Sequence, residues 1–198
     1  MRIIRHLDES LVVRYAALLA DGPVRIVGDI FGAFEVTSEP ATVGKLLAPV
    51  APIDILGIGR NYVAHRDGGG TPPPEHPIVF MKSTGSVQDP EGPIALPRQL
   101  PSDDVVYEGE LAVVVGTRCR NVRADAALDY VFGYTCANDI TARDWQARCG
   151  QWWRGKSFDT FVPLGPCLVL RDEIPDPSLL MIRTSSMGES RRKHPPPT

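Results

Sequence analysis

Glycine and proline interrupt this chain often, and they constrain its fold more than any other feature of the sequence. The 198 residues include 18 glycines and 19 prolines, and both residue types favour turns over long regular elements. Segment 67–77, "DGGGTPPPEHP", holds three glycines and four prolines, so we expect a loop there. An apolar share of 43% is sufficient to build a core. Together these features predict a β-rich α+β fold with many turns.

The first 50 residues form a separate small unit in the predicted organisation. Asp21-Gly22 lies between two apolar segments and tolerates positive φ, which predicts a hairpin turn. Segment 15–20, "YAALLA", is compatible with a helix as well as with a strand. We therefore expect an N-terminal β appendage over residues 1–50 and a larger domain over residues 51–198.

Apolar runs and capping signals place the elements of the larger domain. Strands are predicted in segments 53–62, 78–83, 105–116, 134–140 and 161–170. One helix is predicted over 123–133, closed by Gly133. A second is predicted over 141–150, with Thr141 as N-cap, Asp144 as its capping partner and Gly150 just after the last turn. Residues 181–198 lose apolar periodicity, so we expect them to fray.

Charge and cysteine content narrow the range of partners. The formal net charge is −3, which favours neither nucleic acid nor an acidic membrane surface as partner. The four cysteines form no C-x-x-C pair and are interpreted as reduced thiols. No apolar run approaches the length of a membrane helix. These observations predict a cytoplasmic protein without nucleic acid or membrane partners.

Glu108 and Glu110 stand two residues apart on the strand predicted over 105–116. Side chains with this spacing leave the same face of a strand, which brings two negative charges within about 7 Å of each other. In an apolar setting a divalent cation would offset their repulsion and desolvation, and oxygen ligands suit Mg²⁺, Mn²⁺ or Ca²⁺. An edge strand with its polar face in water explains the pair equally well.

Asp139 adds a third carboxylate at the end of another predicted strand. It precedes a helix, at a position where sites of α/β type commonly place ligands. A turn or cap role would also explain it. Asp144 is accounted for by its capping position, so the predicted metal ligands are Glu108, Glu110 and Asp139.

Five segments, taken in order, resemble the fumarylacetoacetate hydrolase family. They are "GIGRNYVAH", "PIVFMKS", "DDVVYEGELAVVVG", "GYTCANDITARDWQ" and "GKSFDTFVPLGP", and they span about residues 50–170. The resemblance implies a mixed β-sandwich roll that binds Mg²⁺ or Mn²⁺, with Ca²⁺ in some members, and that usually pairs as a homodimer. Glu108, Glu110 and Asp139 match the metal ligands of the family.

The resemblance also implies roles for four residues outside the carboxylate group. Lys156 matches a lysine that faces the substrate, and Arg143 and Gln146 match residues that hold the substrate. His65 matches a histidine that activates water or moves a proton, which an imidazole can do near neutral pH. Without the resemblance, all four would be interpreted as solvent-exposed side chains.

The implied chemistry concerns small 2-oxo or β-diketo acids. Such an acid chelates the metal through neighbouring oxygens, and the enolate that forms is stabilised there. Members of the family carry out C–C hydrolysis, isomerisation, decarboxylation or hydration. Acylpyruvate-type C–C hydrolysis is the leading prediction, and isomerisation or decarboxylation on the same metal site is the alternative.

Two departures from the family pattern support a further alternative, an inactive remnant. Many members carry a glutamate three residues after the histidine, where this chain has Gly68, and Asp67 is the nearby carboxylate. Members also continue beyond this point into a Thr-Gly-Thr-Pro motif that lines the pocket, so the sequence suggests a truncated reading frame. A nucleotide-binding oxidoreductase is set aside because "GIGRNY" lacks the third glycine of G-x-G-x-x-G, with Tyr62 in its place.

Overall fold

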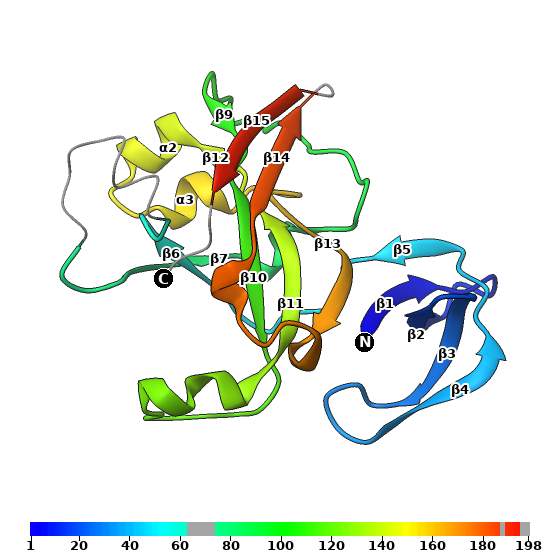
Figure 1. The fold of residues 1–198 in the computed structure, drawn as a ribbon. Helices are drawn as coiled ribbons and strands as arrows, with labels where there is room; N and C mark the ends of the chain where they lie inside the picture. The colour runs from blue at the N-terminus through cyan, green and yellow to red at the C-terminus, as the bar shows by residue number, and fades with distance from the viewer. Residues whose placement is uncertain (63–73, 187–188, 195–198) are drawn as a thin grey trace.

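The largest feature of the chain is a nine-stranded sheet, shown in a computed structural model that describes residues 1–62, 74–186 and 189–194 (Figure 1). Its strand order is β10-β11-β13-β1-β2-β3-β4, with β5 added beside β1 and β8 beside β13. The strands are β1 (Arg2–Leu7), β2 (Val13–Leu19), β3 (Gly22–Gly28), β4 (Phe34–Pro40), β5 (Lys45–Leu47), β8 (Val87–Gln88), β10 (Gly109–Val115), β11 (Val131–Asn138) and β13 (Val162–Leu170). The predicted β-rich α+β fold is confirmed.

The first 50 residues are built from short antiparallel strands, as predicted. β2 and β3 are joined by a tight turn in which Leu19 pairs with Gly22, and Gly22 has a φ of 121°. The segment "YAALLA" is strand rather than helix, because β2 pairs with β1 on one side and β3 on the other. β1 also pairs with β13, so the sheet runs without a break from this unit into the rest of the chain.

A single apolar cluster lies where the two parts of the sheet meet. Its buried members come from both parts, and Leu168 on β13 is fully buried among them. The strand pattern explains this, because alternate residues of β1, β2, β3 and β13 face the same side of the sheet. The other buried members are Ile3, Ala17, Ile26, Ile30 and Val50.

A separate two-stranded sheet is formed by β6 (Ile55–Gly59) and β7 (Ile78–Lys82). One of its faces is apolar and exposed, with Leu56 paired to Met81 and Ile58 to Val79. On the other face, Phe80 packs against Trp152 and Lys82 is buried. This small sheet therefore docks on the rest of the molecule through one face.

Short elements replace the helices that the sequence predicted. Segment 123–133 is a 3₁₀ helix, η2 (Ala124–Tyr130), which runs straight into β11, so its prediction as a helix closed by Gly133 is wrong. Thr141 is not an N-cap, because it belongs to β12 (Thr141–Ala142), which pairs with β9 (Val105–Val106). Gly150 does follow the helix α2 (Arg143–Arg148) with a φ of 65°, as predicted. The remaining helices are α3 (Trp153–Lys156), η1 (Thr84–Ser86), η3 (Arg171–Glu173) and η4 (Pro177–Leu179).

The last part of the chain forms a strand pair, against the prediction that it frays. β14 (Ile182–Ser186) and β15 (Glu189–His194) are antiparallel, and β14 lies beside β10 (Figure 1). Backbone pairing needs no apolar periodicity, which explains why the sequence pattern missed it. Gly109 permits the close approach, since a Cβ there would lie 2.4 Å from the Thr184 hydroxyl oxygen. Within the described residues, no helix is long and apolar enough to cross a membrane.

Candidate active site

The main chain brings Glu108 and Asp139 together where β10 begins and β11 ends. The two strands are antiparallel neighbours, and the Asp139 backbone N–H donates a hydrogen bond of 2.8 Å to the Glu108 carbonyl. The Glu108 N–H in turn donates to Asn138 Oδ1 at 3.1 Å. Glu110 follows inside β10. The three predicted metal ligands therefore lie at the same end of this strand pair.

Two buried lysines hold the carboxylate of Asp139, one on each oxygen. Lys82 Nζ donates to Asp139 Oδ1 and also to the Ile140 carbonyl at 3.1 Å. Lys156 Nζ donates to Asp139 Oδ2 at 2.5 Å. Both lysines are at most 4% exposed. Burial lowers the pKa of Lys82 to about 8, against the opposing effect of the Asp139 charge.

Glu108 is surrounded by donors on its Oε1 atom. The Thr141 hydroxyl donates to it at 2.8 Å, Arg143 lies 2.7 Å away, and Lys156 lies 3.3 Å away. Burial alone would raise the pKa of Glu108, but the charges of Lys156 and Arg143 lower it below its ordinary value. Glu108 is therefore held as a carboxylate in a largely buried setting.

Glu110 has a different environment from the other two carboxylates. Its side chain hydrogen-bonds with Tyr62, whose hydroxyl oxygen also accepts from the Leu111 backbone N–H at 3.0 Å. Among the side chains that the structure describes, no lysine or arginine forms an ion pair with Glu110. Burial raises its pKa to about 7, and the charges of Asp139 and Glu108 contribute to this.

The donor set fits a hard divalent cation by its chemistry, since it consists of buried carboxylate oxygens with mutual repulsion to offset. The described side chains do not, however, form a complete metal-coordination site. Over the described ranges, no three His, Cys, Asp or Glu side chains are already grouped to hold a metal ion. In this arrangement both carboxylate oxygens of Asp139 accept hydrogen bonds from ammonium groups, one from Lys82 and one from Lys156.

The predicted substrate-binding pair lies beside the carboxylates on α2. Arg143 donates from Nη1 to Gln146 Oε1 at 2.9 Å and from Nη2 toward Glu108, so it joins this pair to the acidic group. Both side chains are half-buried rather than fully exposed. Lys156, at the end of α3, also lies 4.8 Å from the Phe80 ring centre. His65, Asp67 and Gly68 lie outside the described residues.

Sequence reasoning missed three residues of this site, Lys82, Tyr62 and Thr141. The sequence did hold a signal that Lys82 is buried, because alternate residues of a strand face the same side. On β7, Lys82 shares a face with Ile78 and Phe80 and not with the exposed Val79. Thr141 was assigned to helix capping, whereas its hydroxyl donates to Glu108. No sequence pattern distinguishes Tyr62 from an ordinary strand-end tyrosine.

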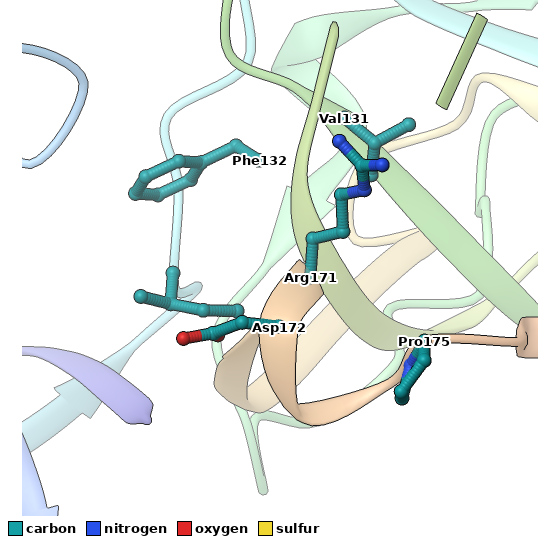
Figure 2. Close-up of a pocket in the computed structure, with 6 residues that line it drawn as sticks. Val131, Phe132, Arg171, Asp172 and Pro175 are labelled. Atoms are coloured by element: carbon teal, nitrogen blue, oxygen red, sulfur yellow. The ribbon is translucent and has the colours of Figure 1, made fainter. Parts of the chain in front are cut away.

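A hollow of about 510 Å³ lies elsewhere, against β11 and the turn that follows β13 (Figure 2). Its lining includes Phe132, Arg171 and Asp172, and none of the carboxylate-site residues. It is shallow and open, and Arg171 is already paired with Asp129 at 3.0 Å. The candidate site residues therefore lie at the carboxylates and not in this hollow.

The fold and the buried group of acids and bases define a strand-rich protein of the fumarylacetoacetate hydrolase type. The family model described as fumarylacetoacetate (FAA) hydrolase C-terminal matches residues 54–195. The chain belongs to this family. Its predicted membership and its fold class are thereby confirmed.

Three similar proteins illustrate the range of the family. An uncharacterised protein of Archaeoglobus fulgidus is 47% identical over 175 residues, which is 87% of this chain and 67% of the relative. The mitochondrial oxaloacetate tautomerase fahd2 of Xenopus laevis is 46% identical over 148 residues, 73% of this chain and 46% of the relative. The solved 5-carboxymethyl-2-hydroxymuconate delta-isomerase of Mycobacterium smegmatis is 36% identical, with a TM-score of 0.84. That alignment covers 98% of this chain and 75% of the solved one. The chain thus spans about half the length of the tautomerase.

Proposed function

We propose that this chain forms the catalytic site of a metal-dependent enzyme that moves a proton beside the ketone of a small 2-oxo acid. The observation that carries the proposal is the group of three carboxylates at the β10–β11 strand ends, the buried Asp139 and the partly buried Glu108 and Glu110, with Arg143 next to them. The names of two similar proteins, a tautomerase and a delta-isomerase, support this class of reaction.

Glu108, Glu110 and Asp139 would hold the cation, and Mg²⁺ or Mn²⁺ suits their oxygen atoms best, with Ca²⁺ as a further candidate. When bound, the cation supplies polarisation of the substrate ketone and stabilisation of the enolate charge. Thr141 and Arg143 contact Oε1 of Glu108 and would orient its carboxylate toward the cation.

The chain's own side chains would bind and orient the acid. The planar guanidinium of Arg143 can donate two parallel hydrogen bonds to a substrate carboxylate. The hydrogen bond of 2.9 Å to Gln146 fixes the direction of this guanidinium. Lys156 would supply an ammonium to the substrate oxygens from a position that is 2% exposed. His65 remains the predicted proton-transfer group, and this role is proposed from the family resemblance.

C–C bond hydrolysis of an acylpyruvate is the second candidate. It is favoured by the match to a family model that describes a hydrolase. Hydrolysis requires an activated water in addition to the enolate stabilisation that both reactions share. His65 is the proposed group for that task, with Asp67 as its candidate partner.

One experiment separates the candidates. The protein is assayed with Mg²⁺ or Mn²⁺ for enol–keto interconversion of oxaloacetate, for its decarboxylation, and for cleavage of an acylpyruvate. Glu108→Ala is compared with Glu91→Ala, which changes an exposed carboxylate. We expect interconversion that Glu108→Ala abolishes and Glu91→Ala preserves. Cleavage without interconversion would favour the hydrolase, and a folded protein inactive in all three assays would favour a non-catalytic remnant. The predicted homodimer is checked by light scattering in the same preparation.

A further inference from the structure

The two lysines on Asp139 have unequal surroundings. Within the described residues, the side-chain hydrogen bonds of Lys82 go to one short segment, to the Asp139 carboxylate and the Ile140 carbonyl. Its backbone is fixed in β7, where it pairs with Ile55. Lys82 therefore anchors the chain just after β11 through both a side chain and a carbonyl.

Lys156 instead lies between two of the three carboxylates. Its Nζ is 2.5 Å from Asp139 Oδ2 and 3.3 Å from Glu108 Oε1, and the Thr141 hydroxyl oxygen lies 2.8 Å away. A cation that binds Asp139 and Glu108 together would come close to the Lys156 ammonium, which already contacts one oxygen of each carboxylate. Two cations cannot share these oxygens without strong repulsion, so Lys156 and a divalent cation compete for them.

We infer that Lys82 is a positioning residue that permanently orients Asp139. Lys156, in contrast, is an exchangeable counter-ion that a divalent cation displaces from Asp139 and Glu108. This inference rests on the proposed function. In the exchange no covalent bond changes, since the ammonium of Lys156 leaves the two carboxylates and becomes available to the substrate oxygens. Lys156 would thus couple cation binding to substrate binding.

The inference predicts opposite effects from the same substitution at the two lysines. Lys156→Met removes the positive charge that competes with the cation, and it frees the Asp139 and Glu108 oxygens that accept hydrogen bonds from Lys156. We therefore expect Mn²⁺ binding to tighten about tenfold. Lys82→Met removes the support of Asp139, and loss of such outer contacts typically weakens metal binding about 10- to 100-fold. Methionine is used at both positions because it retains most of the length of the lysine side chain.

The test is titration of the whole protein with Mn²⁺, followed by electron paramagnetic resonance and by calorimetry, so it does not depend on turnover. Lys45→Met, on an exposed lysine, is the matched control and should bind as the wild type does. Lys82→Arg keeps a positive charge beside Asp139 and should recover most of the affinity. If Lys82→Met does not fold, Lys82→Gln takes its place, with the same expected weakening.

The outcomes distinguish this inference from the function on which it rests. Tighter binding in Lys156→Met together with weaker binding in the Lys82 variant supports it. Wild-type binding that Lys156→Met leaves unchanged or weakens overturns the exchange, while the metal-dependent function stands. Absence of Mn²⁺ binding in the wild type and in both variants overturns the proposed function and the inference together. A larger Mg²⁺-induced rise in Tm for Lys156→Met than for the wild type would support the exchange independently.

Discussion

The backbone N–H of Asp139 donates to the backbone carbonyl of Glu108, so these two acidic residues are joined through the main chain as well as through Lys156. Their proximity follows from the pairing of β10 with β11 and does not depend on side-chain conformation. The sheet therefore sets the main-chain separation of the two acidic residues.

Arg143 is expected to contribute to substrate binding through its planar fork. Arg143→Lys keeps the charge but cannot reach both Glu108 and Gln146, whereas Arg143→Met removes the charge. A charged hydrogen bond is worth about 1.5–3 kcal/mol, so kcat/KM of Arg143→Met should fall about 10- to 100-fold. Steady-state kinetics with oxaloacetate measures this, and an Arg143→Lys variant with wild-type kcat/KM would contradict the role of the fork.

Gly155 is expected to tolerate no side chain. A Cβ there would lie 2.5 Å from the Ala142 carbonyl oxygen and 2.5 Å from the Gln146 nitrogen, and both are backbone atoms that cannot move aside cheaply. Gly155→Ala should therefore destabilise the protein by about 1–3 kcal/mol through overpacking. Urea unfolding measures the change.

Gly85→Ala is the matched control for that substitution, because the nearest atom to its Cβ would be the Ser83 Oγ at 3.4 Å. Its free energy of unfolding should stay within about 0.5 kcal/mol of the wild type. Equal destabilisation by both alanines would show that contact between α2 and α3 is not what restricts Gly155.

Leu168 is expected to stabilise both parts of the large sheet at once. It is fully buried in the cluster shared by β1, β2, β3 and β13, so Leu168→Ala should cost about 2–5 kcal/mol. Leu179→Ala, at a side chain that is 82% exposed, should cost less than about 0.5 kcal/mol. Thermal unfolding followed by two probes, one in each part, checks whether both transitions shift together. A shift confined to one part would indicate that residues 1–50 unfold independently.

Asp89 is expected to make stability depend on acid pH. Burial would raise the pKa of its carboxyl, but hydrogen bonds from the Lys45 ammonium and the Ala48 N–H outweigh this and lower the pKa below 3.8. Because the folded pKa is the lower one, the stabilisation is complete above the ordinary value and is lost as the pH falls through the lowered value.

The Asp89→Asn variant tests this pH dependence. It should be less stable than the wild type by about 0.5–1 kcal/mol near pH 7, and the difference should vanish at strongly acid pH. Urea titrations across the acid range measure it, with Asp54→Asn, at an exposed position, as the control. A difference that persists unchanged at the lowest pH would show that the carboxylate charge is not responsible.

The sequence predicted the strand over 161–170 well, because this run is rich in apolar and β-branched residues. The single strand predicted over 105–116 is instead two strands, β9 and β10, which belong to different sheets. The sequence also predicted that Glu108 and Asp139 belong to one site, although it placed Glu108 inside a strand and the structure places it just before β10.

The helix predicted over 123–133 was correct in position for residues 124–130, as a 3₁₀ helix, and wrong for 131–133, which are strand. The prediction that the tail frays was wrong for its described residues, because apolar periodicity does not report backbone pairing. The buried ammonium of Lys82 was missed because its counter-charge, Asp139, comes from another sheet.

The link between Lys82 and Asp139 joins the small β6–β7 sheet to the large one, and the small sheet packs through one face only. If the two sheets separated, Asp139 would lose its ion pair with Lys82 while most of the core stayed intact. Loss of catalytic competence would therefore precede global denaturation, as a partial opening that hydrogen exchange at Leu56 and Met81 would reveal first.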